Sequence, residues 1–71
     1  MSIGERIRIE RERLDLSQEE LAKKLEINSE MIVNWELGKN YPLRKYQFKL
    51  CDIFGCDIYY LLGELDNRNN I

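Results

Sequence analysis

Apolar residues recur at helical spacing along most of this 71-residue chain, and the pattern predicts an all-α fold. The predicted helices run from Ile3 to Leu14, twice within Ser17–Gly38, from about Leu43 to Phe54, and from the cap Asp57 to Leu62. The chain shows no strand signal, no internal repeat and no linker long enough to separate domains. We therefore expect one compact five-helix domain over residues 1–63, followed by a frayed polar tail over residues 64–71.

The stretch Ser17–Gly38 carries the clearest local signals. Ser17 and Glu20 have the spacing of a capping box, and Asn28 is a second good N-cap. An apolar face follows each cap: Leu21, Ala22 and Leu25 in the first helix, Ile32 and Trp35 in the second. Because Gly38 accepts the left-handed conformation, it marks the end of the second helix. Two short helices joined so closely indicate a helix-turn-helix, whose second helix can enter a DNA major groove.

The first predicted helix places an arginine among its apolar positions. Ile7, Arg11 and Leu14 share one face, with Ile3 one turn earlier. The remaining charged residues alternate in sign and predict solvent-exposed pairs at i,i+3 and i,i+4: Glu5, Arg6, Arg8, Glu10, Glu12 and Arg13.

Composition argues against catalysis, a metal site and a membrane span. The chain has no histidine, and its two cysteines, Cys51 and Cys56, lie five apart in apolar surroundings that favour core positions. No apolar run approaches the roughly 20 residues of a membrane helix, and arginines occupy the would-be core of a signal peptide. We expect a cytoplasmic protein that is not an enzyme and carries no cofactor.

The distribution of charge matters more than the net charge of −2 and the pI near 5.1. Residues 1–50 have a balance of +1, whereas residues 51–71 have a balance of −3. The acidic excess therefore lies away from the helix-turn-helix stretch, and non-specific binding to nucleic acid is expected to be weak.

Counted from Gln18, the apolar residues fall at motif positions 4, 8, 10, 15 and 18, with the small Ala22 at position 5. This pattern resembles the Cro and phage-repressor type of helix-turn-helix domain, also called lambda repressor-like. Flanking segments resemble the landmarks of that family in the same order: Gly4-Glu5-Arg6-Ile7-Arg8, Leu16-Ser17-Gln18-Glu19-Glu20-Leu21-Ala22, Trp35-Glu36-Leu37-Gly38-Lys39, Asp52-Ile53-Phe54-Gly55 and Tyr60-Leu61-Leu62-Gly63. The resemblance covers roughly residues 3–63.

The resemblance implies that the third helix presents side chains to base edges. Ser29, Glu30 and Asn34 then occupy the base-reading surface, with Val33 beside them able to pack on a thymine methyl group. Alternatively, Ser29 and Glu30 do not contact bases and are solvent-exposed residues of the first turn, where the helix dipole favours them. Trp35 is expected in the core.

The resemblance also implies contacts to the DNA backbone. Gln18 would touch a phosphate or anchor the third helix, and Arg44 or Lys45 would add a phosphate contact near the start of the fourth helix. The loop after the third helix would follow the backbone through Lys39, Asn40 and Tyr41. In such repressors the positions of Arg11 and Glu36 form a pair that bridges the first and third helices.

Two glutamates depart from the family pattern. Motif position 9 is usually glycine, and Glu26 there costs about 1–2 kcal/mol if the left-handed backbone is kept. Glu30 adds repulsion from phosphates, although a carboxylate can accept a hydrogen bond from cytosine N4.

These observations predict a sequence-specific transcriptional regulator, a repressor that binds palindromic double-stranded DNA as a homodimer. The apolar C-terminal helix is the expected dimer interface, through Ile58, Tyr59, Leu62 and Leu65, with Tyr60 and Leu61 beside them. The acidic pI, Glu26 and Glu30 favour an alternative: an antitoxin-like or antirepressor module that binds another protein.

Overall fold

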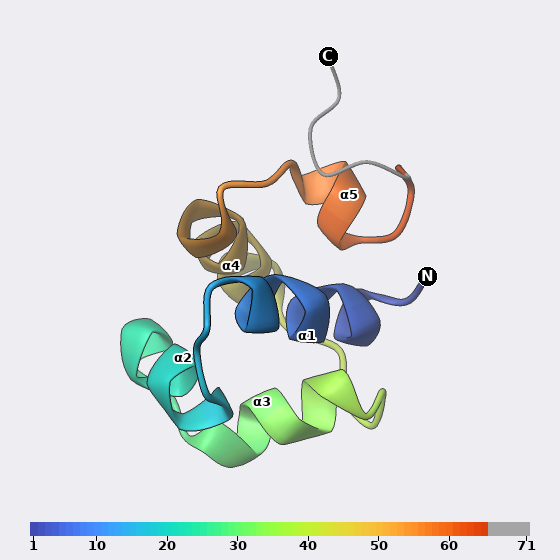
Figure 1. Ribbon diagram of the computed structural model, residues 1–71. Coiled ribbons are helices and arrows are strands. Elements are labelled where there is room, and N and C mark those ends of the chain that lie inside the picture. The colour runs from blue at the N-terminus through green and yellow to red at the C-terminus, as the bar shows by residue number, and fades with distance from the viewer. Residues whose placement is uncertain (66–71) are drawn as a thin grey trace.

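The computed structural model describes residues 1–65 of the chain (Figure 1). Within that range the five helices are α1 (Ile3–Arg13), α2 (Gln18–Leu25), α3 (Ser29–Glu36), α4 (Arg44–Phe54) and α5 (Ile58–Leu61). This confirms the all-α prediction, with each helix ending within a residue or two of its predicted boundary. In Figure 1, α1 lies in the middle of the domain, between α5 on one side and α3 on the other.

Side-chain caps fix where the helices begin. Ser17 and Glu20 form the predicted capping box, with the Glu20 N–H donating to Ser17 Oγ at 3.0 Å and the Ser17 N–H donating to Glu20 Oε1 at 2.8 Å. Ser2 and Glu5 form a second box at the start of α1. These bonds satisfy N–H groups that have no acceptor inside their own helix.

Left-handed residues end α1 and α2. Glu26 has φ 58° and ψ 43°, so the left-handed backbone is kept at the position where the family usually has glycine. The Ile27 N–H donates to the Ala22 carbonyl at 3.0 Å, so the strained residue closes a well-bonded turn. Asp15, with φ 57°, has the same conformation after α1, where the sequence pattern predicts none.

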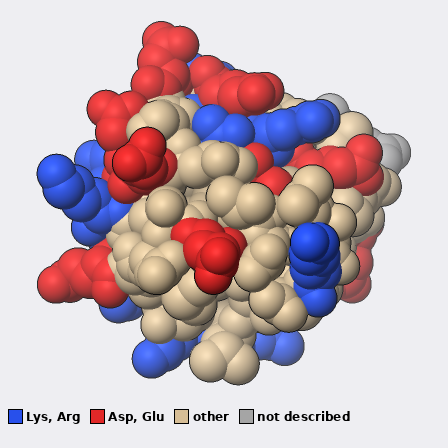
Figure 2. Space-filling model, turned by 90° about the horizontal axis from the view of Figure 1, so that it is seen from below, with Lys and Arg blue, Asp and Glu red and all other residues tan. Residues whose placement is uncertain are grey.

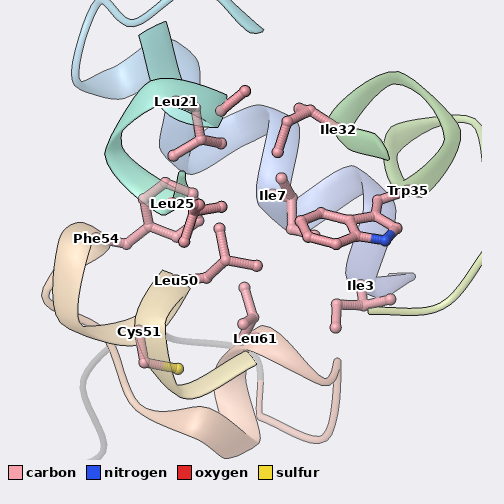
Figure 3. Packing of buried hydrophobic residues seen from close by; sticks show 11 residues of the cluster. Ile3, Ile7, Leu21, Leu25, Ile32, Trp35, Leu50, Cys51, Phe54 and Leu61 are labelled. Carbon is pink, nitrogen blue, oxygen red and sulfur yellow. The ribbon is translucent and has the colours of Figure 1, made fainter. Parts of the chain in front are cut away.

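All five helices contribute to one apolar core (Figure 3). Its buried members include Ile3, Ile7, Leu21, Ala22, Leu25, Ile32, Trp35, Leu50, Cys51, Phe54 and Leu61. Burial raises the pKa of the Cys51 thiol to about 12, so this thiol is protonated at neutral pH and acts as a core residue. Cys56 is only half-buried.

The prediction that every charged residue of α1 except Arg11 faces solvent is wrong for Arg6 and Glu10. Their exposed fractions are only 4% and 1%. Arg6 stacks over the Tyr60 ring at 4.1 Å and donates through Nη1 to the carbonyls of Tyr60 and Leu65, at 3.1 and 2.7 Å. Glu10 accepts from the Tyr60 hydroxyl at 2.9 Å. These bonds offset the cost of burying two charged groups.

The same contacts involve two residues that follow position 63. The Glu64 N–H donates to the Tyr59 carbonyl at 2.8 Å, and the Leu65 carbonyl accepts from Arg6. The rest of the predicted frayed tail lies outside the described residues.

Two apolar predictions need correction. Leu14 lies just past the end of α1 and is 37% exposed rather than inside the core. Tyr60 and Leu61 are buried in the domain, so they are not part of a free apolar surface. Of the expected dimer residues, Tyr59 is exposed, whereas Ile58, Leu62 and Leu65 are half-buried.

Candidate nucleic-acid interface

Helix α3 has one face in the core and the other at the surface. Ile32 and Trp35 are buried, at 0% and 3% exposure. The surface side carries the four predicted base-reading residues, of which Glu30 is exposed and Ser29, Val33 and Asn34 are half-buried. Trp35 therefore has the expected core position.

Uncharged atoms dominate the α3 side of the molecule. Figure 2 views the domain from below in Figure 1, the side on which α3 lies, and shows a mainly uncharged centre with most Lys and Arg atoms toward the rim. None of Ser29, Val33 and Asn34 is charged, and Glu30 is acidic. Recognition by this surface would therefore depend on hydrogen bonds and apolar contacts rather than on cations.

An ion pair fixes the far end of α3. Arg11 of α1 donates from Nε to Glu36 Oε2 at 2.7 Å and from Nη2 to Glu36 Oε1 at 3.0 Å, which confirms the pair that the resemblance implied. Arg11 Nη1 also donates to the Leu16 carbonyl at 2.9 Å. The hydrogen bond to Glu36 raises the pKa of the Arg11 guanidinium, against the opposing effect of burial.

Gln18 completes this cluster from the start of α2. Its Nε2 donates to Glu36 Oε1 at 3.1 Å, so its side chain links α2 to α3. Of the two roles considered for Gln18, the structure contains the anchoring contact. The three side chains Arg11, Gln18 and Glu36 thus set the orientation of α3 against α1 and α2.

Gly4 allows α1 and α3 to approach closely. A Cβ atom at this position would collide with the Trp35 carbonyl oxygen, and the Glu36 carbonyl oxygen would be only 3.1 Å away. The approach therefore requires glycine, independently of backbone conformation. The sequence pattern shows no signal for this role, because it depends on a contact over thirty residues away.

The loop after α3 is bonded to the end of that helix. Gly38 is left-handed, with φ 77°, and its N–H donates to the Trp35 carbonyl at 3.1 Å. The Lys39 N–H donates to the Asn34 carbonyl at 2.9 Å. This is a Schellman closure, so Lys39 has a fixed backbone position relative to the surface of α3.

The predicted backbone-contacting residues lie in or just after this loop. Lys39, Asn40 and Tyr41 are exposed, as is Arg44 in the first turn of α4. Buried Pro42 stabilises the loop from inside, because its carbonyl accepts from Gln47 Nε2 at 2.9 Å. These residues thus follow the end of α3, and the Gln18 side chain contacts Glu36 in the last turn of the same helix.

Within residues 1–65, no cluster of three or more His, Cys, Asp or Glu side chains is arranged to hold a metal ion. None of the helices described is both long and apolar enough to span a membrane.

Comparisons with known proteins agree with this geometry. A family model described as helix-turn-helix matches residues 7–61. The chain is 36% identical over 69 residues to the HTH-type transcriptional regulator DicA of Escherichia coli strain K12, covering 96% of this chain and 51% of DicA. The chain thus spans about half the length of that curated relative.

A solved structure has the same fold. It is the P22 c2 repressor in complex with a synthetic operator, which superposes with a TM-score of 0.85 at 29% identity, over 92% of this chain and 98% of that one. With the match to the family model over most of its length, the chain belongs to the helix-turn-helix family.

Proposed function

We propose that the chain is a sequence-specific DNA-binding domain of a transcriptional regulator, a repressor that acts in the cytoplasm and is not an enzyme. The observation that carries this proposal is the surface of α3, which is solvent-facing, fixed at one end by the Arg11–Glu36 pair and continued at that end by the Lys39 loop. The names of the two relatives support it: one is a transcriptional regulator and the other a repressor in complex with operator DNA.

In this proposal α3 lies in the major groove and specificity is divided among four side chains. Asn34 pairs with adenine, and Val33 packs on a thymine methyl group. Glu30 accepts from cytosine N4, a contact that offsets its repulsion from phosphates. Ser29 contributes a hydroxyl that can donate or accept.

Attraction to the DNA backbone comes from outside α3. Lys39, Asn40 and Tyr41 follow the phosphates beside the end of α3, and Arg44 adds a contact from the start of α4. Gln18 adds a phosphate contact at the start of α2 through the amide hydrogen that it does not donate to Glu36. Because few of these residues are basic, the affinity for DNA should depend only weakly on the salt concentration.

Two copies would bind a palindromic operator, with the α3 helices about 34 Å apart. Tyr59, which is 55% exposed, lies at the centre of the proposed dimer surface, with Ile58, Leu62 and Leu65 around it. Sedimentation at tens of micromolar protein tests this part; a purely monomeric chain would count against it.

Selection of bound duplexes from a random pool tests the main proposal. The parent chain is expected to enrich one motif, and Asn34→Ala and Glu30→Ala are expected to relax it at different positions. Unchanged preference in both variants would refute the base-reading assignment. If no motif is enriched while a protein partner binds stably, the chain is instead the antitoxin-like interaction module that its acidic pI also allows.

A further inference from the structure

A pocket of about 430 Å³ lies beside the proposed DNA-contacting loop. It is formed between the start of α1, the end of α3 and the loop, with Leu62 closing one side. The residues that matter here are Ser2, Ile3, Trp35, Lys39, Tyr41 and Leu62. Its volume is within the range of about 300–1,000 Å³ that small-molecule sites occupy.

The walls of this pocket are mainly apolar, and the charge that lines it is positive. Ile3, Trp35 and Leu62 supply apolar surface. Lys39 supplies an ammonium group, whereas the capping box at the start of α1 already satisfies the Glu5 N–H through Ser2 Oγ. Among the described residues lining the pocket, none is acidic. The combination fits an anionic head group attached to an apolar body.

The indole N–H of Trp35 is a second donor beside this pocket. Trp35 is only 3% exposed, and its indole nitrogen donates no hydrogen bond to another group within residues 1–65. Figure 3 shows that nitrogen on the ring edge turned away from Ile7, on the side of Ile3, which lines the pocket. Because this nitrogen is not among the buried polar atoms that lack a partner, it keeps some contact with solvent and can donate to an acceptor in the pocket.

The negative charge of the Glu5 carboxylate, near the start of α1, would repel an anion in the pocket. This carboxylate accepts from the Ser2 N–H and from the Ser2 hydroxyl, both at 3.0 Å, and is thereby held in the capping box. Its charge reduces the contribution of the α1 dipole. Lys39 and the Trp35 indole N–H are therefore the groups on which recognition of the anion depends.

We propose that this pocket binds a small carboxylate with an apolar body, and that the ligand weakens DNA binding. The carboxylate lies between Lys39 and the indole N–H, and the apolar body packs on Ile3, Trp35 and Leu62. Occupancy neutralises Lys39 and engages Tyr41, two residues that the DNA backbone would otherwise contact. The binding step stands on the pocket alone, whereas the effect on DNA rests on the proposed function.

The test uses the full chain and 3-cyclohexylpropanoate, a probe that does not absorb where tryptophan does. Trp35 is the only tryptophan, so its fluorescence and its single indole N–H resonance in NMR both report on the pocket. We expect saturable binding and a shift of the indole resonance. The neutral amide of the probe, and acetate as a head group alone, are each expected to bind about tenfold more weakly.

Two variants separate recognition from general charge. Lys39→Ala is expected to weaken binding about tenfold, whereas Lys49→Ala, which removes an exposed lysine outside the pocket, leaves it unchanged. Trp35→Phe keeps an aromatic side chain but removes the indole N–H, so calorimetry should show weaker binding. Equal affinity for the acid and its amide, or no saturable response at millimolar probe, would overturn the site.

The DNA arm has its own outcome. A several-fold loss of affinity for the selected duplex at saturating probe supports the coupling. If the probe binds but DNA affinity is unchanged, the site stands and the proposed effect on DNA is wrong. If the chain selects no duplex at all, the proposed function fails, while the fluorescence and NMR titrations still decide the pocket.

Discussion

Arg11 and Glu36 form a bidentate ion pair between α1 and α3, with Nε–Oε2 and Nη2–Oε1 distances of 2.7 and 3.0 Å. The exposed fractions of the two side chains are only 12% and 6%. Planar guanidinium and carboxylate groups meet here in the geometry that makes such pairs specific. Because Gln18 of α2 donates to the same carboxylate, the Glu36 side chain holds α3 to both α1 and α2.

Replacing Arg11 should therefore destabilise the whole domain. Arg11→Met keeps much of the side-chain volume but leaves Glu36 buried without its cation, at an expected cost of about 3–5 kcal/mol in the free energy of unfolding. Urea denaturation followed by circular dichroism measures it. Arg11→Met/Glu36→Leu, which removes both charges, should recover part of the loss. The exposed Arg8→Met is the control, and a loss for Arg11→Met no larger than for this variant would contradict the role of the pair.

Gly4→Ala should be costly for a different reason. The added methyl group has no space, because the Trp35 carbonyl lies against this position and backbone atoms cannot move aside cheaply. The helices α1 and α3 must separate, and we expect a loss of about 1–3 kcal/mol in unfolding free energy. Alanine otherwise favours helix, so Arg8→Ala in the same helix should be near neutral. A Gly4→Ala variant as stable as the parent would show that the close approach is not required.

Glu26→Gly should stabilise the chain. The left-handed conformation at Glu26 is unfavourable for a residue with a Cβ atom and free of that penalty for glycine. Part of the gain is lost to the greater freedom of glycine in the unfolded chain, so the expected net effect is about 0.5–1 kcal/mol. Lys23→Gly, inside α2, is the matched control and should destabilise by about 1 kcal/mol. Thermal unfolding of both variants decides the sign.

The accuracy of the sequence-based predictions depended on the range of the interactions involved. Caps such as Ser17 and Asn28 and the apolar spacing of α2 and α3 act over a few residues, and they placed the helices well. The Arg11–Glu36 pair spans 25 residues and came from the family resemblance rather than from spacing. Patterning alone predicted no such contact.

The wrong predictions also concern interactions between residues far apart in the sequence. Arg6 and Glu10 share a helical stripe with Ile3 next to Ile7, a signal for burial that the charge of the two residues concealed. Arg6 is buried because Tyr60 and the Leu65 carbonyl fold back onto it from the far end of the chain. Leu14 leaves the core because Asp15 turns the backbone just after α1. Each outcome depends on tertiary geometry that a short sequence window does not contain.

Stability should fall in acid through the two capping boxes. Hydrogen bonds from the backbone N–H and then the hydroxyl of Ser17 lower the pKa of the Glu20 carboxyl, and those from Ser2 lower that of Glu5 in the same way. A carboxyl with a lower pKa in the folded state stabilises the fold above its unfolded pKa. That stability is lost as the pH falls through the folded value.

Thermal unfolding between roughly pH 6 and pH 3 checks this expectation. Glu5→Gln/Glu20→Gln keeps side chains that can accept the capping hydrogen bonds but cannot titrate, so its melting temperature should fall less steeply below about pH 5. Glu19→Gln removes a carboxylate from the same turn of α2 and should retain the steep parental response. Identical acid profiles for the double variant and the parent would exclude the capping boxes as its source.

Lys39→Ala should change how DNA binding depends on salt without changing which sequence is preferred. In the proposed function Lys39 contacts a phosphate, and loss of one such contact reduces the slope of log K against log[salt] by about 0.9. A phosphate contact carries no base information, so affinity should fall by a similar factor on every duplex.

Val33→Ala should do the reverse, with the same salt slope and a weaker preference for thymine at one position. Lys49→Ala, on the exposed side of α4, serves as the control for charge alone. An unchanged slope for Lys39→Ala, or a preference altered at one base pair, would show that the loop does not supply the attraction assigned to it.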